Sequence, residues 1–225
     1  MKDFLKNNNI FYIPYLLFVI IGFVIILTTE KLFLHSHFNS LVGNPFIDLF
    51  FKYETHLGDG LFLVLVGIIF FFFNLKNGLF LLLAYAVSGG FTQFLKEIFF
   101  NEDMRPFFYH SFYKFPLKVV DGVTMYSQNT FPSGHATSAF CLFFCLSFFS
   151  TKNWQKVVMF LLALITGFSR IYLSQHFFTD VFVGSIIGVV VSSILAYVFY
   201  VSKFSTKFVR IERPICKVFK NKNGQ

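Results

Sequence analysis

The sequence predicts an all-α, polytopic membrane protein with six transmembrane helices and an interfacial helix between the first two. Three observations predict this fold class. Hydrophobic residues make up 56% of the 225 residues and charged residues only 13%, whereas a soluble domain carries about 25% charged residues. Phe alone contributes 38 residues, more than one aqueous core of this size can bury. Six apolar segments have the length of roughly 17–25 residues that a membrane helix needs.

The apolar segments, identified by hydropathy, cover residues 10–29, 57–74, 78–99, 134–151, 154–173 and 177–201. The first is interpreted as a retained anchor rather than a signal peptide, because no small-residue cleavage site follows it. The second is the weakest, since Asp59 and Gly60 interrupt its beginning. Apolar residues recur at helical spacing between Pro45 and Tyr53, which predicts the interfacial helix.

One membrane-embedded domain is expected over residues 1–225, with a motif-bearing core at about 78–201 and a basic tail at 202–225. The net charge of +8 arises mostly from this tail. A basic run directly after an apolar span is typical of the cytoplasmic side, where it contacts anionic headgroups, and we favour this interpretation over nucleic-acid binding. With both termini inside, the inner segments hold 12 Lys and Arg residues and the outer segments 7, which supports this orientation.

Polar side chains lie at the ends of four apolar segments, and such positions are costly unless they are functional. With both termini inside, all of these ends face outward, and they carry Lys96, Arg105, Ser133, His135, Arg170, His176 and Asp180. Three cations suit a phosphate group, and two histidines suit acid–base or nucleophilic chemistry. His176 and Asp180 are spaced i, i+4, so Asp180 can accept the Nδ1–H of His176 and leave Nε2 free. Gly134 begins an apolar segment, where free N–H groups bind anions.

Two motifs resemble signatures of the type 2 phosphatidic acid phosphatase superfamily. They are Pro132-Ser133-Gly134-His135 and Ser169-Arg170-x5-His176-x3-Asp180, and both match in full. The pair Lys96 and Arg105-Pro106 is similar to a further signature. The resemblance covers about residues 90–200, and the first two apolar segments fit the six-helix plan of that family only in general shape.

The resemblance implies a role for each motif residue. His176 would be the nucleophile and form a phosphohistidine, Asp180 would orient it, and His135 would protonate the leaving oxygen and then activate water. The phosphoryl oxygens would be held by the remaining motif residues, which are Lys96, Arg105, Ser133, Gly134 and Arg170. No metal or other cofactor is expected, because the cations supply the charge neutralisation that a metal ion would give.

The predicted function is therefore an integral-membrane lipid phosphatase, a hydrolase of phosphoric esters or diphosphates. It would act at the outer face of a bacterial inner membrane, with several spans and both termini cytoplasmic. Its expected partners are a phosphorylated membrane lipid and the bilayer. Lipid A 1-phosphate and undecaprenyl pyrophosphate are favoured, while phosphatidylglycerol phosphate and phosphatidic acid stay open, as does the oligomeric state.

Other functions are weighed against this one. A phosphotransferase would use the same phosphohistidine with another acceptor. A scaffold or transporter is disfavoured because no position of the two full motifs is lost, and a haloperoxidase because it is usually soluble. His135, His176 and Asp180 also form a possible metal-ligand set, but three adjacent cations disfavour it.

The first signature departs from the family pattern, because eight residues separate Lys96 from Arg105 where six are usual. On a continuous helix with 3.6 residues per turn, this spacing places the two side chains on opposite sides. We therefore expect the helix to end near Phe100 and an ordered loop to return Arg105 to the site.

Four histidines in the outer connections, His35, His37, His56 and His110, are interpreted as interfacial or solvated. Glu54, His56 and Asp59 lie near the same outer face, and lining a substrate entrance is the less favoured interpretation for them.

Overall fold

The computed structural model describes residues 8–202, which form helices joined by loops, with no strand among the described residues. The elements are α2 (Asn9–Thr28), α3 (Lys31–Asn39), α4 (Pro45–Glu54), η1 (Thr55–Gly58), α5 (Gly60–Phe73), α6 (Leu75–Ile98), α7 (Pro106–Tyr113), α8 (Gly134–Phe149), α9 (Asn153–Tyr172) and α10 (Phe178–Tyr200). The predicted all-α class is confirmed.

Four of these helices, α2, α6, α9 and α10, are long and apolar enough to cross a membrane. The segments Pro45–Gly58 and Gly60–Phe73 form a pair bent by 55°, which brings the number to five if the pair counts as one span. Helix α8 is apolar but shorter, with 16 residues. These helices support a multi-pass membrane protein, and the count of six spans stays a prediction.

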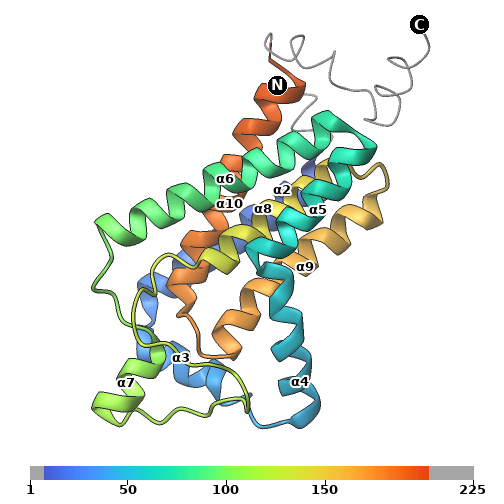
Figure 1. Cartoon of the computed structure of the whole chain (residues 1–225). Coiled ribbons are helices and arrows are strands. Elements are labelled where there is room, and N and C mark those ends of the chain that lie inside the picture. Colours follow the sequence, from blue (N-terminus) through green and yellow to red (C-terminus); the bar gives the residue numbers. More distant parts are fainter. Residues whose placement is uncertain (1–7, 203–225) are drawn as a thin grey trace, which may run out of the picture.

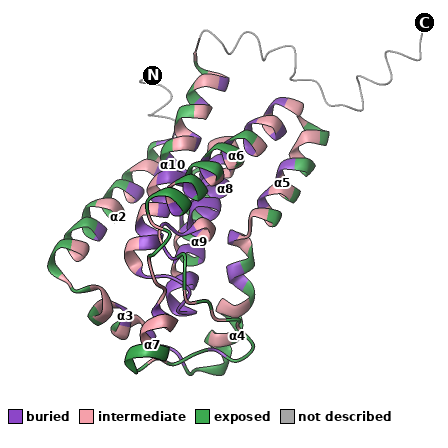
Figure 2. Cartoon of the chain, turned by 60° about the vertical axis from the view of Figure 1, so that its left-hand side comes forward, coloured by how far each residue is buried: buried purple, intermediate pink, exposed green. Residues whose placement is uncertain are grey.

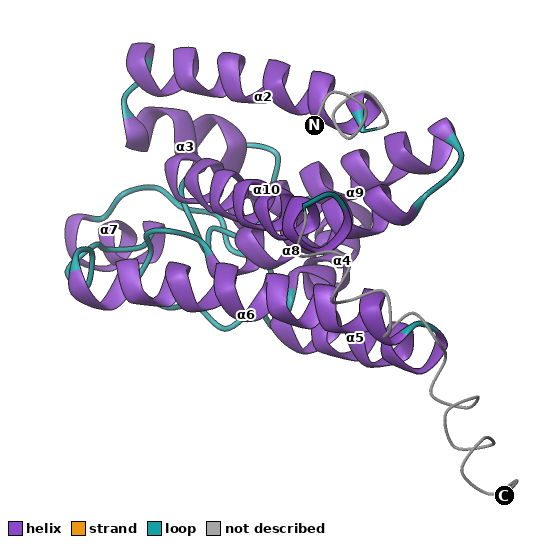
Figure 3. Ribbon diagram, turned by 90° about the horizontal axis from the view of Figure 1, so that it is seen from above, coloured by secondary structure: helices purple, strands orange, loops and turns teal. Residues whose placement is uncertain are grey.

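Helix α8 occupies the middle of the bundle, where it packs against α6, α9 and α10 (Figure 3). Its Phe140 and Phe144 belong to the main apolar core, together with Phe11 of α2 and Phe80 of α6. Figure 2 shows that buried residues concentrate along α8 and α9, whereas much of α2 is exposed. An exposed helix this apolar is expected to face lipid.

Two glycines of α10 allow its backbone to touch that of α8. A Cβ atom at Gly184 would lie 2.6 Å from the carbonyl oxygen of Ser133, and one at Gly188 would lie 2.5 Å from that of Thr137. Any larger residue would push the two helices apart. The close contact places the beginning of α10 beside the beginning of α8, where the two full motifs lie.

The short helices α3, α4 and α7 gather at one end of the bundle (Figure 1). Helix α4 matches the helix predicted from Pro45 to Tyr53. It begins after Asn44, whose side chain accepts hydrogen bonds from the N–H groups of Phe46 and Ile47. Its position at a membrane interface stays a prediction. The basic tail lies outside the described residues from Lys203 onward.

Candidate active site

Helix α6 ends close to the predicted position. Its last residue is Ile98, and the chain then turns back, so that Arg105 N–H donates to the Ser127 carbonyl at 2.9 Å and Thr130 N–H to the Asp103 carbonyl at 3.2 Å. This pairing brings Arg105 close to the segment that leads into the motif residues 132–135. Lys96, in the last turn of α6, is only 9% exposed and thus does not face lipid. The expectation of a helix break and an ordered return is confirmed.

The loop between α9 and α10 carries His176 and folds tightly onto the end of α9. The N–H groups of Gln175 and His176 both donate to the Arg170 carbonyl, at 2.9 and 3.1 Å. In the first turn of α10, Asp180 Oδ2 accepts a hydrogen bond of 2.8 Å from the N–H of Phe177. Asp180 is therefore fixed beside the imidazole of His176, with 3.4 Å between Oδ2 and Nδ1.

Thr130, which the motif analysis missed, sets the tautomer of His176. Its hydroxyl donates to Asp180 Oδ2, and its Oγ1 lies 3.3 Å from His176 Nδ1. A hydroxyl carries a single proton, so once that proton is given to Asp180, Nδ1 must be the donor toward Thr130. The imidazole is held with its proton on Nδ1 and its lone pair on Nε2.

Three cations surround His176. Arg170 is 7% exposed, Lys96 is equally buried and Arg105 is half-buried. Among residues 8–202, none of the three forms an ion pair with a carboxylate. Burial is the main cause that holds the pKa of His176 well below its usual range, and the charges of Arg105, Arg170 and Lys96 lower this pKa further. The imidazole is therefore neutral near pH 7.

The two arginines differ in how their donors are used. Arg105 donates to the carbonyls of Gln128, Asn129 and Gln175, at 2.7, 3.3 and 3.2 Å, and so ties the returning loop to the His176 segment. Arg170 Nη1 donates to Thr55 Oγ1 at 2.7 Å, but its buried Nε has no hydrogen-bond partner within the described part of the chain. Arg170 therefore keeps a donor for an anion, while Arg105 also holds the loop.

The start of α8 lies against the same site. Ser133 caps α8 by accepting from the N–H of Ala136 at 3.3 Å, and its own N–H donates to the Asp180 carbonyl at 3.0 Å. Gly134 is the first residue of the helix, and His135 follows it. The His135 ring lies within electrostatic range of Arg170 and His176. The residues of both full motifs are thus brought together.

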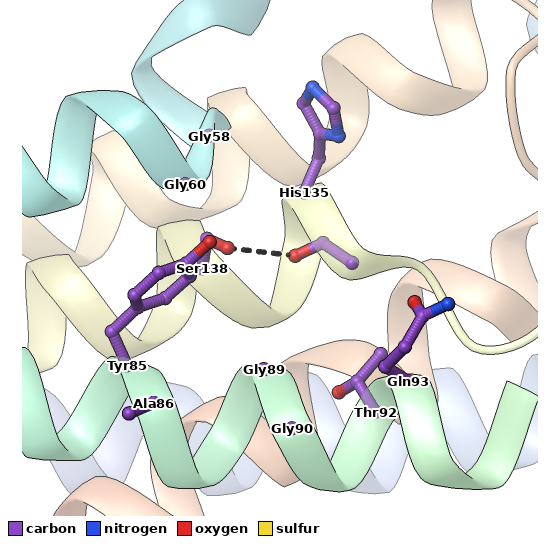
Figure 4. A pocket seen from close by; sticks show the side chains of 11 residues that line it. Gly58, Gly60, Tyr85, Ala86, Gly89, Gly90, Thr92, Gln93, His135 and Ser138 are labelled. Atoms are coloured by element: carbon purple, nitrogen blue, oxygen red, sulfur yellow. Dashed lines mark hydrogen bonds between the residues drawn. The ribbon is translucent and has the colours of Figure 1, made fainter.

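A cavity of about 460 Å³ opens beside His135, between α5, α6 and α8 (Figure 4). Most residues of its wall are small, including five glycines and Ser138, and Tyr85 and Gln93 are larger members. Gly134 and His135 are the motif residues in the lining. The volume falls within the range of small-molecule sites.

The interpretation of His35 as interfacial or solvated is wrong. Its side chain is 1% exposed, its Nε2 lies 3.2 Å from Ser174 Oγ, and its ring meets that of Phe177 edge-on at 5.3 Å. Burial lowers the pKa of His35 to about 4, against an opposing effect of Asp180. His35 lies in a short helix that contacts a segment 139 residues away, so local hydropathy carries no sign of this burial.

Other histidines match the expectation more closely. His37 and His56 are exposed, and His110 is half-buried with Nδ1 2.7 Å from the Phe115 carbonyl. His56 is not merely solvated, since its Nδ1 lies 3.1 Å from Asp59 Oδ2. Glu54 is buried rather than lining an entrance, and its carboxylate accepts a hydrogen bond from Thr166.

Comparison with known proteins defines the class. The chain matches the PAP2 superfamily over residues 77–204, more than half of its length, and therefore belongs to that superfamily. The matched region contains every predicted site residue. Membership confirms the resemblance drawn from the motifs.

Individual relatives agree with this assignment. The chain is 29% identical to phosphatidylglycerophosphatase B of Bacillus subtilis over 77% of this chain and 82% of the relative. It is 35% identical to lipid A 1-phosphatase of Porphyromonas gingivalis, but over only 30% of this chain and 16% of that protein. These relatives and the family confirm the prediction of a phosphoric ester hydrolase.

Two solved structures share the fold. LpxE of Aquifex aeolicus superposes with a TM-score of 0.63 at 31% identity, covering 73% of this chain and 93% of the other. A PAP2-type phosphatidylglycerolphosphate phosphatase of Bacillus subtilis gives a TM-score of 0.61 at 23% identity, covering 84% and 96%. The second similarity concerns the fold alone.

Proposed function

We propose that this protein is a membrane lipid phosphatase that works without a metal ion, through a phosphohistidine on His176. One observation carries the proposal. A neutral, buried imidazole with its lone pair on Nε2 lies among three cations that form no ion pair with a carboxylate among the described residues. A phosphate supplies the negative charge that these cations lack, and the neutral imidazole supplies the nucleophile.

In the first step, His176 Nε2 attacks the phosphorus and the bond from phosphorus to the ester oxygen breaks. His135 donates its proton to the leaving oxygen, so that the lipid departs as an alcohol. Lys96, Arg105 and Arg170, with the Ser133 hydroxyl and the Gly134 N–H, stabilise the negative charge on the phosphoryl oxygens. Asp180 and Thr130 stabilise the positive charge that develops on the His176 ring.

In the second step, His135 takes a proton from a water molecule whose oxygen attacks the phosphorus. The bond between phosphorus and Nε2 breaks, inorganic phosphate leaves, and His176 returns to its neutral form. The proton that His135 lost in the first step is thereby restored, so the cycle closes without any net change in the enzyme.

The favoured substrates are lipid A 1-phosphate and undecaprenyl pyrophosphate. The name of one relative, lipid A 1-phosphatase, agrees with the first of these. Phosphatidylglycerol phosphate is the chief alternative, since another relative is named phosphatidylglycerophosphatase B. The cavity beside His135 lies where the leaving part of the substrate would lie. We place the site at the outer face of a bacterial inner membrane, with six spans and both termini cytoplasmic, as the distribution of Lys and Arg supports.

The deciding experiment offers four lipids to the purified protein in detergent with EDTA and measures released inorganic phosphate. The lipids are lipid A carrying a 1-phosphate, undecaprenyl pyrophosphate, phosphatidylglycerol phosphate and phosphatidic acid. Wild-type protein should release phosphate from at least one lipid, and His176→Ala should lose at least about 10³-fold in kcat/KM. His37→Ala, which alters an exposed histidine, is the matched control and should retain activity.

Three outcomes would count against the proposal. They are complete dependence on an added metal ion, equal activity of His176→Ala, and release of phosphate only when a second lipid or sugar acceptor is present. The last would indicate a phosphotransferase. An alkaline quench with a ³²P-labelled substrate adds a direct readout, because label should stay on wild-type protein and be missing from His176→Ala.

A further inference from the structure

We propose that Asp59 is a positioning residue for His135. Its carboxylate favours the protonated imidazole and fixes the orientation of the ring toward the leaving oxygen, and His56 holds this carboxylate in place. The inference rests on the function proposed above. Asp59 and His56 lie outside residues 77–204, the region that matches the superfamily, so they belong to a part of the chain that the motifs do not cover.

The backbone around Asp59 is pressed against the site. Asp59 lies at the bend between η1 and α5, with a glycine on each side. A Cβ atom at Gly58 would lie 3.0 Å from the His135 carbonyl oxygen, and one at Gly60 would lie 1.8 Å from the hydroxyl oxygen of Tyr85. A side chain at Gly58 would crowd the His135 backbone, so this glycine lets the Asp59 segment lie close to His135.

Both oxygens of the Asp59 carboxylate face imidazoles. Oδ1 lies 3.3 Å from His135 Nε2, and Oδ2 lies 3.1 Å from His56 Nδ1. Asp59 stands at the N-cap position of α5, yet among the described residues its side chain caps no N–H group of that helix. The carboxylate is therefore directed to the two histidines rather than to its own helix.

The charges around His135 explain what the carboxylate does. A general acid must carry its proton when the phosphate ester arrives. Burial disfavours a positive charge on His135, and the guanidinium charges of Arg170 on α9 and Arg105 on the returning loop disfavour it further. His176 faces the ring from the α9–α10 loop. Asp59 is the carboxylate in contact with the ring, and its negative charge acts in the opposite direction.

The proton balance leaves Asp59 unchanged. When the ester oxygen arrives, the proton on His135 Nδ1 passes to that oxygen, while Nε2–H stays directed at Asp59 Oδ1. In the second step His135 recovers a proton from the attacking water. Asp59 neither gains nor loses a proton, which distinguishes a positioning residue from a catalytic one.

The test compares two phosphate monoesters that differ in their leaving groups. The leaving group of phosphatidic acid is an alkoxide, which requires a proton. The leaving group of p-nitrophenyl phosphate is a stabilised phenolate, which does not. We expect Asp59→Asn to lower kcat/KM about 10- to 100-fold for phosphatidic acid and less than about 3-fold for p-nitrophenyl phosphate. The ratio kcat/KM reports the steps up to the first phosphoryl transfer, so the water step does not obscure the comparison.

Two further variants sharpen the test. Asp59→Glu keeps the charge and should recover part of the loss, and His56→Gln should show a smaller loss with the same dependence on the leaving group. For Asp59→Asn, the alkaline limb of the profile with phosphatidic acid should move to lower pH, because the imidazolium loses its counter charge. Asp121→Asn, which alters an exposed loop residue, is the matched control and should leave both substrates unaffected.

The outcomes separate this inference from the proposed function. If Asp59→Asn lowered kcat/KM equally for both substrates, or for neither, the proposed role of Asp59 would be overturned. The phosphohistidine scheme would remain intact. If wild-type protein hydrolysed neither these esters nor any lipid of the panel, the proposed function itself would fail. A thermal unfolding midpoint of Asp59→Asn equal to that of wild type confirms that the variant is folded.

Discussion

The surroundings of the two motif histidines differ in burial and in the nature of their partners. His176 is 2% exposed and is held by Thr130 and Asp180 on a tight loop. The side chain of His135 is 33% exposed, faces a cavity and contacts a carboxylate that is itself half-exposed. The His176 region is buried, and the His135 region is partly open.

This difference corresponds to the different tasks proposed for the two rings. A nucleophile works on one atom, the phosphorus, and gains from a rigid, neutral ring in a place without water. A general acid and base must meet the leaving group of the substrate and later a water molecule, so it needs space beside it. Variants near His135 should therefore lower kcat/KM by an amount that depends on the leaving group, whereas variants near His176 should lower it equally for all leaving groups.

The largest effect is expected for Arg170→Lys on the His176 side. A lysine has a single nitrogen, so it cannot bond Thr55 from one nitrogen and direct a second, separately placed nitrogen to the phosphate, as Nη1 and Nε of Arg170 can. We expect kcat/KM to fall by about 10²- to 10³-fold. The fall should be the same for phosphatidic acid and p-nitrophenyl phosphate, since the transferred phosphoryl group is identical.

Steady-state kinetics with both substrates checks this prediction. Lys114→Met, which removes an exposed cation after α7, serves as the control and should change little. A loss of activity confined to phosphatidic acid would show that Arg170 acts on the leaving group. It would contradict the proposed division of tasks between the His176 and His135 regions.

An intermediate effect is expected for Thr130→Val. The change keeps the shape of the side chain but removes the hydroxyl that links Asp180 to His176 Nδ1. A buried carboxylate that loses a partner costs about 1–3 kcal/mol, and we expect a decrease in kcat/KM of about 10- to 100-fold for both esters. Thr28→Val, at the exposed end of α2, controls for hydroxyl loss, and unchanged kinetics of Thr130→Val would refute the tautomer argument.

The smallest effect on activity is expected for His35→Gln, which should instead change the pH dependence of stability. The pKa of His35 is about 4 in the folded protein and about 6.5 when unfolded. The unfolded state therefore binds more protons between these values. The contribution of His35 to the free energy of unfolding is therefore fully present above about pH 6.5. It is lost as the pH falls toward 4, with a slope of at most about 1.4 kcal/mol per pH unit.

Thermal unfolding midpoints at pH 7 and pH 5 provide the measurement. The midpoint of the wild-type protein should fall further from pH 7 to pH 5 than that of His35→Gln. His37→Gln should behave as wild type because His37 is exposed. An equal loss in wild type and His35→Gln would show that His35 does not link the fold to pH.

The sequence predicted the helices and the motif residues well, because both depend on local patterns. Hydropathy located the long apolar helices, and the spacing of Lys96 and Arg105 correctly required a break after α6. The sequence also predicted that His176 and Asp180 lie close together, which is confirmed, but His176 lies in the loop before α10 and the pair meets through that loop rather than through helical i, i+4 spacing. These inferences use only neighbours along the chain or the periodicity of one helix.

The sequence analysis missed Thr130 and the burial of His35, and it assigned Asp59 no role at His135, because turns whose course no periodicity determines position all three residues. Thr130 lies at the end of a long irregular segment, and Asp59 lies at a bend that interrupts an apolar run. His35 is buried by a contact with Ser174, far along the chain. Two signals were nevertheless present. Glycines flank Asp59, and a hydroxyl residue precedes the Pro132 motif by two positions.

The hydrogen bond from Ser133 N–H to the Asp180 carbonyl also bears on the timing of biosynthesis. A ribosome delivers the chain from its N-terminus, so Ser133 and Thr130 emerge well before Asp180. Until the last helix enters the membrane, the hydroxyl of Thr130 has no carboxylate to meet and the tautomer of His176 is not set. A nascent chain halted before that point would carry most of its cations and still be inert.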